Sequence, residues 1–84
     1  MSLIYIGKSG KKKVLITPYC QKRLQQRNLN AREVLQILTY HRHASYPIDE
    51  DGRQKIRAAI GNKKAFLTIM EDSKKIIVIT GGEA

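Results

Sequence analysis

A tyrosine and two arginines spaced four residues apart, Tyr19, Arg23 and Arg27, have the side chains best suited to chemistry in this chain. Their segment is predicted to be helical, and each step of four residues turns only about 40° around a helix. The three side chains should therefore share one side of that helix. They form either a solvated ridge or one wall of an anion site. Arginine suits phosphate because its planar fork makes paired, charge-assisted hydrogen bonds.

The charge balance favours a polyanionic partner. The chain has 16 Lys and Arg residues against 7 Asp and Glu, a net charge of +9 and a pI near 10.0. Three of the acids are consecutive, Asp49 to Asp51, so the rest of the chain is more basic than the total indicates. A domain this basic is typical of nucleic-acid binding. Solubility alone is the alternative explanation.

A second group of cations alternates with apolar residues along a predicted strand. Arg53, Lys55 and Arg57 should occupy one face of it. Three like charges without interleaved acids repel one another, and a polyanion would relieve that repulsion. We therefore expect phosphate contacts here, with an ordinary exposed sheet face as the alternative. Tyr40 and Tyr46 are near enough in sequence to stack on bases.

The two histidines, His41 and His43, are candidates for proton transfer. Metal-independent RNA cleavage needs a general base for the 2′-hydroxyl and a general acid for the leaving oxygen. We take His41 as a candidate catalytic residue, and a polar helix-to-strand connection as the alternative. No Cys, Asp or Glu lies within four residues to complete a metal site, so we expect no metal and no cofactor.

A glycine and lysine near the N-terminus superficially suggest a phosphate-binding loop. Gly7 and Lys8 fail that test, because Ser2 stands where the loop requires its first glycine and a strand follows instead of a helix. A basic hairpin tip, with Lys11 and Lys12 contacting a phosphate backbone, is the better interpretation.

Hydrophobic periodicity and turn residues predict two strands, two helices and four strands, in that order. The predicted strands are Met1–Ile6, Lys12–Thr17, Ala44–Ile48, Arg53–Ile60, Ala65–Met70 and Lys75–Thr80, and the predicted helices are Pro18–Arg27 and Ala31–Thr39. Thr17 should cap the first helix, and Asn30 with Glu33 should form a capping box on the second.

These elements predict one α+β domain over residues 1–84, with the order ββααββββ. Two helices should pack on one face of an antiparallel β-meander, behind an N-terminal hairpin. The most apolar strand, Lys75–Thr80, should be central, and Gly81 and Gly82 should end it.

Cysteine content and apolar runs favour a soluble cytoplasmic protein without a membrane segment. Cys20 is the only cysteine, so no disulfide can form within the chain, and a buried thiol is expected. No signal peptide is visible, and the longest apolar run, Ile76–Ile79, is far too short to span a bilayer.

The chain resembles a family of small uncharacterised bacterial proteins. The resemblance rests on Tyr-Cys-x-x-Arg-Leu-x-x-Arg-x-Leu from Tyr19, then Asn-x-x-Glu-Val from Asn30, then a β-meander ending at Thr80. That family usually opens with His-Ala-x-x-Arg-Met-x-x-Arg-Gly-Ile, and is placed beside RelE-type and barnase/EndoU-type toxins, which are metal-independent ribonucleases. The resemblance covers residues 17–80 and implies a RelE/barnase-like fold.

The resemblance also implies site residues. Arg23 and Arg27 stand at the family's helix arginines, and Thr80 stands at the polar position that ends its final strand. Tyr19 replaces the usual histidine, and Asn28 the usual glycine. With a normal pKa near 10, tyrosine is a poor base at neutral pH. Catalysis would then use a histidine elsewhere, or tyrosine with arginine, or the protein would bind RNA without cutting it.

The leading hypothesis is a basic RNA-binding protein, acting as a toxin-type endoribonuclease with an antitoxin-like protein partner. One alternative is a non-catalytic module that binds nucleic acid or an acidic protein. The other is a basic structural domain that pairs edge strands into a homodimer.

Overall fold

The computed structural model describes residues 2–42 and 46–84. The described residues form strands, helices and short turns in the following order. The elements are β1 (Ile4–Ser9), β2 (Lys12–Ile16), α1 (Pro18–Gln26), α2 (Ala31–Tyr40), β3 (Arg53–Ile60), β4 (Lys63–Glu71) and β5 (Lys75–Glu83).

The strands form one mixed, five-stranded sheet in the order β1-β2-β5-β4-β3. β3, β4 and β5 are the predicted antiparallel meander, and β5 is central as expected. The prediction of a wholly antiparallel sheet is wrong, because β2 and β5 run parallel. A parallel pair needs a long crossover connection, and here both helices and two strands lie between β2 and β5 in the chain.

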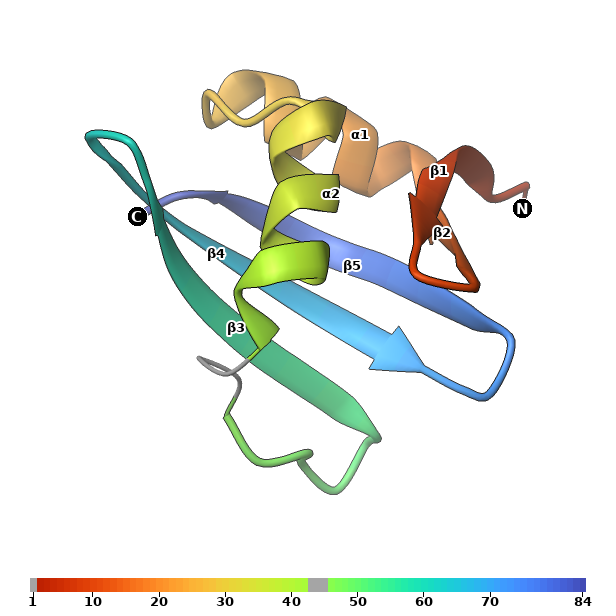
Figure 1. The fold of residues 1–84 in the computed structure, drawn as a ribbon. Helices are drawn as coiled ribbons and strands as arrows, with labels where there is room; N and C mark the ends of the chain where they lie inside the picture. Colours follow the sequence, from red (N-terminus) through yellow and green to blue (C-terminus); the bar gives the residue numbers. More distant parts are fainter. Residues whose placement is uncertain (1, 43–45) are drawn as a thin grey trace.

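Both helices cover one face of the sheet, which confirms the α+β class and leaves the other face open. Figure 1 shows α2 lying in front of the strands. The core between the helices and the sheet is a single cluster that includes Leu24, Ile37 and Leu67, each nearly or fully inaccessible to solvent. Burial of such apolar side chains is the main stabilising contribution in a domain this small.

The helix boundaries follow from capping. The Thr17 hydroxyl accepts a hydrogen bond from the Cys20 N–H at 3.0 Å. The Asn30 side chain accepts from the Glu33 N–H at 2.8 Å, and the Glu33 carboxylate accepts from the Asn30 N–H at 3.1 Å. Both predicted caps are confirmed. Between the helices, Asn28 adopts a left-handed φ of 57°, a conformation that favours glycine or asparagine.

The predicted strand Ala44–Ile48 is not confirmed. Ala44 and Ser45 lie outside the described residues, and residues 46–48 are not in a strand. The Tyr46 N–H nevertheless donates to the Lys55 carbonyl at 2.8 Å, so this segment runs beside the edge of β3. Pro47 has no N–H to continue such a ladder.

The strands extend further than predicted at Gly7 and at Gly81 and Gly82. Gly7 belongs to β1, next to an irregularity in its pairing with β2. Gly81 and Gly82 do not end β5, which continues to Glu83. Glycine is needed there for close approach: a Cβ on Gly81 would lie 2.6 Å from Leu67 Cδ2 and 2.8 Å from the Phe66 carbonyl oxygen.

Candidate nucleic-acid interface

Alternation along the strands sorts the lysines and arginines between the two faces of the sheet. On β3, Ile56 is buried beneath the helices, whereas Lys55 and Arg57 are exposed on the open face. The same alternation, with the strand registers, gives the set of open-face strand cations. They are Lys8, Lys13, Arg53, Lys55, Arg57, Lys64 and Lys75.

Arg27 reaches the open face from α1, around the free side of β5. β2 pairs with β5 only as far as Val78, so the end of β5 is not covered on that side. The Arg27 carbonyl accepts a hydrogen bond from the Glu83 N–H at 2.9 Å. A Cβ on Gly82 would lie 2.5 Å from Arg27 Cβ, so the arginine stem passes directly over this glycine. Its guanidinium carbon then lies 5.9 Å from the centre of the Phe66 ring.

Arg57 continues this arrangement on β3. It is the direct cross-strand partner of Phe66, and its guanidinium carbon lies 5.8 Å from the centre of the Tyr46 ring. Guanidinium groups and aromatic rings therefore alternate across the open face, in the order Arg27, Phe66, Arg57, Tyr46. We call these four residues the Arg–ring ladder. Cation–π contacts hold the guanidiniums in place while leaving their N–H groups able to bind a ligand.

Two shallow hollows flank Arg57. One, of about 260 Å³, lies beside Tyr46, Arg53 and Thr68, and the other, also about 260 Å³, lies beside Lys55 and Phe66. Thr80 is the cross-strand partner of Thr68, which in turn pairs with Lys55. The strand registers thus bring the predicted residues Thr80, Lys55 and Arg57 onto the face that Arg27 reaches from α1.

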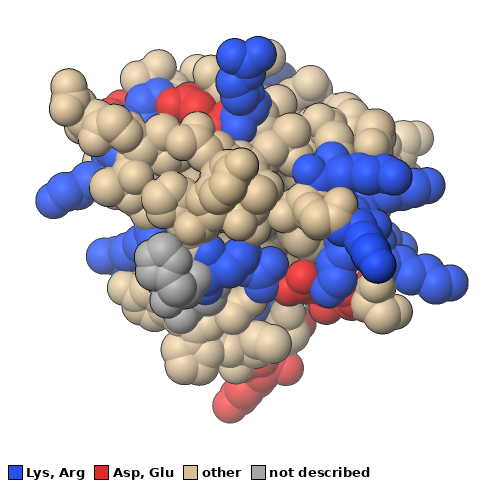
Figure 2. All heavy atoms as spheres, in the orientation of Figure 1, with Lys and Arg blue, Asp and Glu red and all other residues tan. Residues whose placement is uncertain are grey.

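Acidic residues are distributed differently. The strand acids Glu71 and Glu83 are register partners of the buried residues Ile76 and Ala65, so they belong to the helix-covered side. Figure 2, which views that side, shows acids lying among cations. On the open face, Asp49 lines a hollow with Arg53 at the margin. Asp72, in the turn between β4 and β5, interacts with Lys75. No ion pair among the described residues joins a carboxylate to the other open-face cations Lys8, Lys13, Lys55, Arg57 and Lys64.

Glu71 neutralises a predicted phosphate contact. It pairs with Lys12 at 2.8 Å and with Arg42 at 2.6 Å, and Arg42 also donates to the Gln54 side chain at 3.2 Å. Lys12 therefore serves to tie the hairpin to the end of β4. Lys11 stays exposed in the β1–β2 turn.

This ion-pair cluster should make stability depend on pH. Hydrogen bonding from Arg42, and then from Lys12, holds the pKa of Glu71 below its usual 4.5. A carboxylate with a lowered folded-state pKa stabilises the fold above its unfolded pKa and loses that contribution as pH falls through the folded pKa. We expect thermal stability to fall as pH drops below about 4.5, and to fall less in Glu71→Gln. Melting curves from pH 7 to pH 3 test this; equal losses in both proteins would contradict it.

Tyr19, Arg23 and Arg27, predicted to share one side of the first helix, have different surroundings. Tyr19 is 63% exposed in the first turn of α1. Arg23 is half-buried; its Nη1 lies 3.5 Å from Gln26 Oε1, and its Nε is buried without a hydrogen-bond partner. Of the two arginines, Arg27 is the one whose guanidinium lies over the Phe66 ring on the open face.

His41, the histidine that the structure describes, follows the last turn of α2 rather than joining the Arg–ring ladder. His41 caps the C-terminus of α2, on the helix-covered side, and its N–H donates to the Ile37 carbonyl at 2.9 Å. His43 lies outside the described residues.

Neither the cysteine nor a cluster of metal ligands adds another reactive centre to the described residues. Burial raises the pKa of Cys20 to about 11, so this side chain stays a thiol at neutral pH. Within residues 2–42 and 46–84, no three His, Cys, Asp or Glu residues are placed to hold one metal ion.

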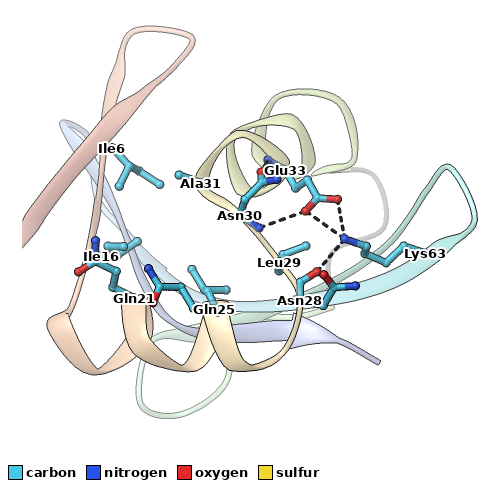
Figure 3. A pocket seen from close by; sticks show the side chains of 11 residues that line it. Ile6, Ile16, Gln21, Gln25, Asn28, Leu29, Asn30, Ala31, Glu33 and Lys63 are labelled. Atoms are coloured by element: carbon cyan, nitrogen blue, oxygen red, sulfur yellow. Dashed lines mark hydrogen bonds and ion pairs between the residues drawn. The ribbon is translucent and has the colours of Figure 1, made fainter.

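A larger hollow, of about 420 Å³, lies on the helix side and is drawn in Figure 3. Its floor is apolar and includes Ile6 and Ile16, and its rim carries the amides of Gln21 and Gln25. Lys63 closes one end, where its ammonium donates to Glu33 and to the Asn28 carbonyl. None of the predicted site residues lines this hollow.

Comparison with protein-family models, with curated proteins and with solved structures gives no match. Neither α1 nor α2, the helices of the described chain, is long and apolar enough to cross a membrane.

Several residues of the open face were not singled out from the sequence. Phe66 is one, although it alternates with buried Ala65 and Leu67 on a predicted strand. Lys13 and Lys75 are others, and their direct pairing follows from the parallel contact between β2 and β5. The alternation of Lys13 with buried Val14 indicates from the sequence that Lys13 is exposed. The pairing of β2 with β5 has no comparable signal in the sequence.

Proposed function

We propose that this protein binds RNA through the open face of its sheet. The observation that carries the proposal is the Arg–ring ladder, in which Arg27 and Arg57 lie beside the Phe66 and Tyr46 rings. One guanidinium can donate two parallel hydrogen bonds to phosphate oxygens. Guanidinium planes and aromatic rings can also stack on bases. The combination suits a ligand that presents both groups close together.

The surrounding charge supports the same ligand. Lys55 and Arg53 extend the cationic surface along β3, and Lys13 and Lys75 extend it across β2 and β5. Mutual repulsion among these side chains is relieved when a phosphate backbone replaces the mobile counterions around it. A net charge of +9 also attracts a polyanion to the molecule over longer distances.

RNA cleavage is a second proposed activity, favoured by the two guanidiniums near Phe66. Groups of this kind stabilise charge that develops on a phosphate in the transition state. Cleavage also needs proton transfer, and His41 lines neither of the two hollows that flank Arg57. Among the described residues, Tyr46 and Lys55 line a hollow beside Arg57 and are the candidates for proton transfer there. Binding therefore rests on more of the described residues than catalysis does.

The experiment is a titration of a fluorescently labelled, unstructured RNA of about 12 nucleotides, without metal, between about 50 and 300 mM salt. We expect binding whose log affinity falls linearly with log salt, by about 0.7 for each phosphate contacted. The same samples, run on a denaturing gel, report cleavage. Absence of binding at the lowest salt would contradict the proposed function.

A further inference from the structure

An apolar row crosses the open face next to the Arg–ring ladder. Tyr5, Leu15, Ile77 and Met70 are successive cross-strand partners on four neighbouring strands, and Arg53 ends the row. Tyr5 is 54% exposed and Met70 40% exposed. The row extends about 14 Å, because neighbouring strands lie about 4.8 Å apart. We call these four residues the apolar row.

Cations lie on both sides of the apolar row. On one side of the apolar row, Lys13 is the cross-strand partner of both Lys8 and Lys75. In the other direction, Lys55 and then Arg57 follow Arg53 along β3. Each step of two residues is about 6.6 Å. The open face is therefore an apolar strip between two basic borders.

The strip lies on the open face of the sheet, outside the hollows described above. Neither of the two hollows that flank Arg57 includes Leu15 or Ile77. An amphipathic helix from a protein partner buries its apolar face in a groove. A nucleobase needs only a flat apolar surface, with cations nearby for the phosphates on either side of it.

We infer that the RNA bound by the open face is single-stranded and that its bases lie on the apolar row. This inference rests on the proposed function. In a duplex the bases are stacked inside the helix, and the molecule offers phosphates and 2′-hydroxyls to a protein surface. Duplex binding would therefore leave Leu15 and Ile77 uncovered, whereas unstacked bases bury them.

The test compares the labelled RNA of the previous experiment with the same RNA annealed to its complement. Leu15→Thr/Ile77→Thr reduces the apolar surface, leaves the net charge unchanged and places a β-branched residue, which favours strands, at both positions. Met70→Gln is a second variant at an exposed position, where the fold tolerates change. Circular dichroism melting checks that each variant is folded.

We expect the wild type to bind the single strand roughly tenfold or more tightly than the duplex. The double variant should lose roughly tenfold in single-strand affinity, and Met70→Gln a smaller factor, with the salt dependence unchanged in both. Equal affinity for single strand and duplex would overturn the inference while leaving RNA binding intact. Unchanged single-strand affinity in both variants would also overturn it. If the wild type binds neither RNA, the proposed function itself fails.

Discussion

Replacing Arg27 and Arg57 together by alanine should weaken binding of a single-stranded RNA by roughly 30-fold or more at about 100 mM salt. Both guanidiniums belong to the Arg–ring ladder, and no carboxylate pairs with either among the contacts of the described residues. Their removal should also reduce the slope of log affinity against log salt by about 1.4, because each phosphate contact contributes about 0.7. Fluorescence anisotropy at several salt concentrations measures both quantities.

The matched control is Lys22→Ala/Arg32→Ala. It also removes two positive charges, but from exposed positions on α1 and α2, away from the open face. Long-range attraction alone predicts a similar, small loss in both variants, about threefold or less. The proposal predicts that only the Arg27/Arg57 variant shows the large loss and the reduced slope. Equal losses in the two double variants would show that the open face has no special role.

The second large effect concerns the core. Leu67→Ala should lower the free energy of unfolding by about 3 kcal/mol. Leu67 is inaccessible to solvent in the middle of β4, and its side chain occupies the space above Gly81. Natural domains are stable by only about 5–15 kcal/mol, and an 84-residue chain has a thin core, so this is a large part of the total. Urea denaturation followed by circular dichroism measures the change.

Met70→Ala is the control on the same strand. Met70 lies on the open face, so its truncation should cost less than about 1 kcal/mol of stability. RNA binding should show the reverse order of effects. Met70→Ala should reduce RNA affinity, whereas folded Leu67→Ala should bind RNA like the wild type. A stability loss as large in Met70→Ala as in Leu67→Ala would contradict the assignment of the two faces.

Local patterns were sufficient to predict most of the individual elements. Pro18 after Thr17, and the pairing of Asn30 with Glu33, are short-range signals, and both helices begin where these signals place them. Alternation predicted the strand Arg53–Ile60 with correct bounds. The parallel contact of β2 with β5 was not predicted, because it joins residues about 60 positions apart and no short motif encodes it.

The candidate site was predicted in part for the same reason. The alternation of Lys55 and Arg57 with buried residues placed them correctly on an exposed face. Arg27 was expected to act beside Arg23 and Tyr19 along the helix, and instead its guanidinium lies over Phe66 on the sheet. That contact requires Gly82 beneath the arginine stem. The sequence pattern indicates only that Gly82 ends a strand, and not that a distant side chain lies over it.

The most direct test of the central claim is a map of which lysines RNA protects. The free protein and its complex with the labelled single strand are treated with an amine-acetylating reagent, and the modified sites are identified by mass spectrometry. We predict protection of Lys13, Lys55 and Lys75 on the open face, while Lys22 on α1 reacts as it does in the free protein. Protection of Lys22 with Lys55 and Lys75 still reactive would contradict RNA binding through the open face.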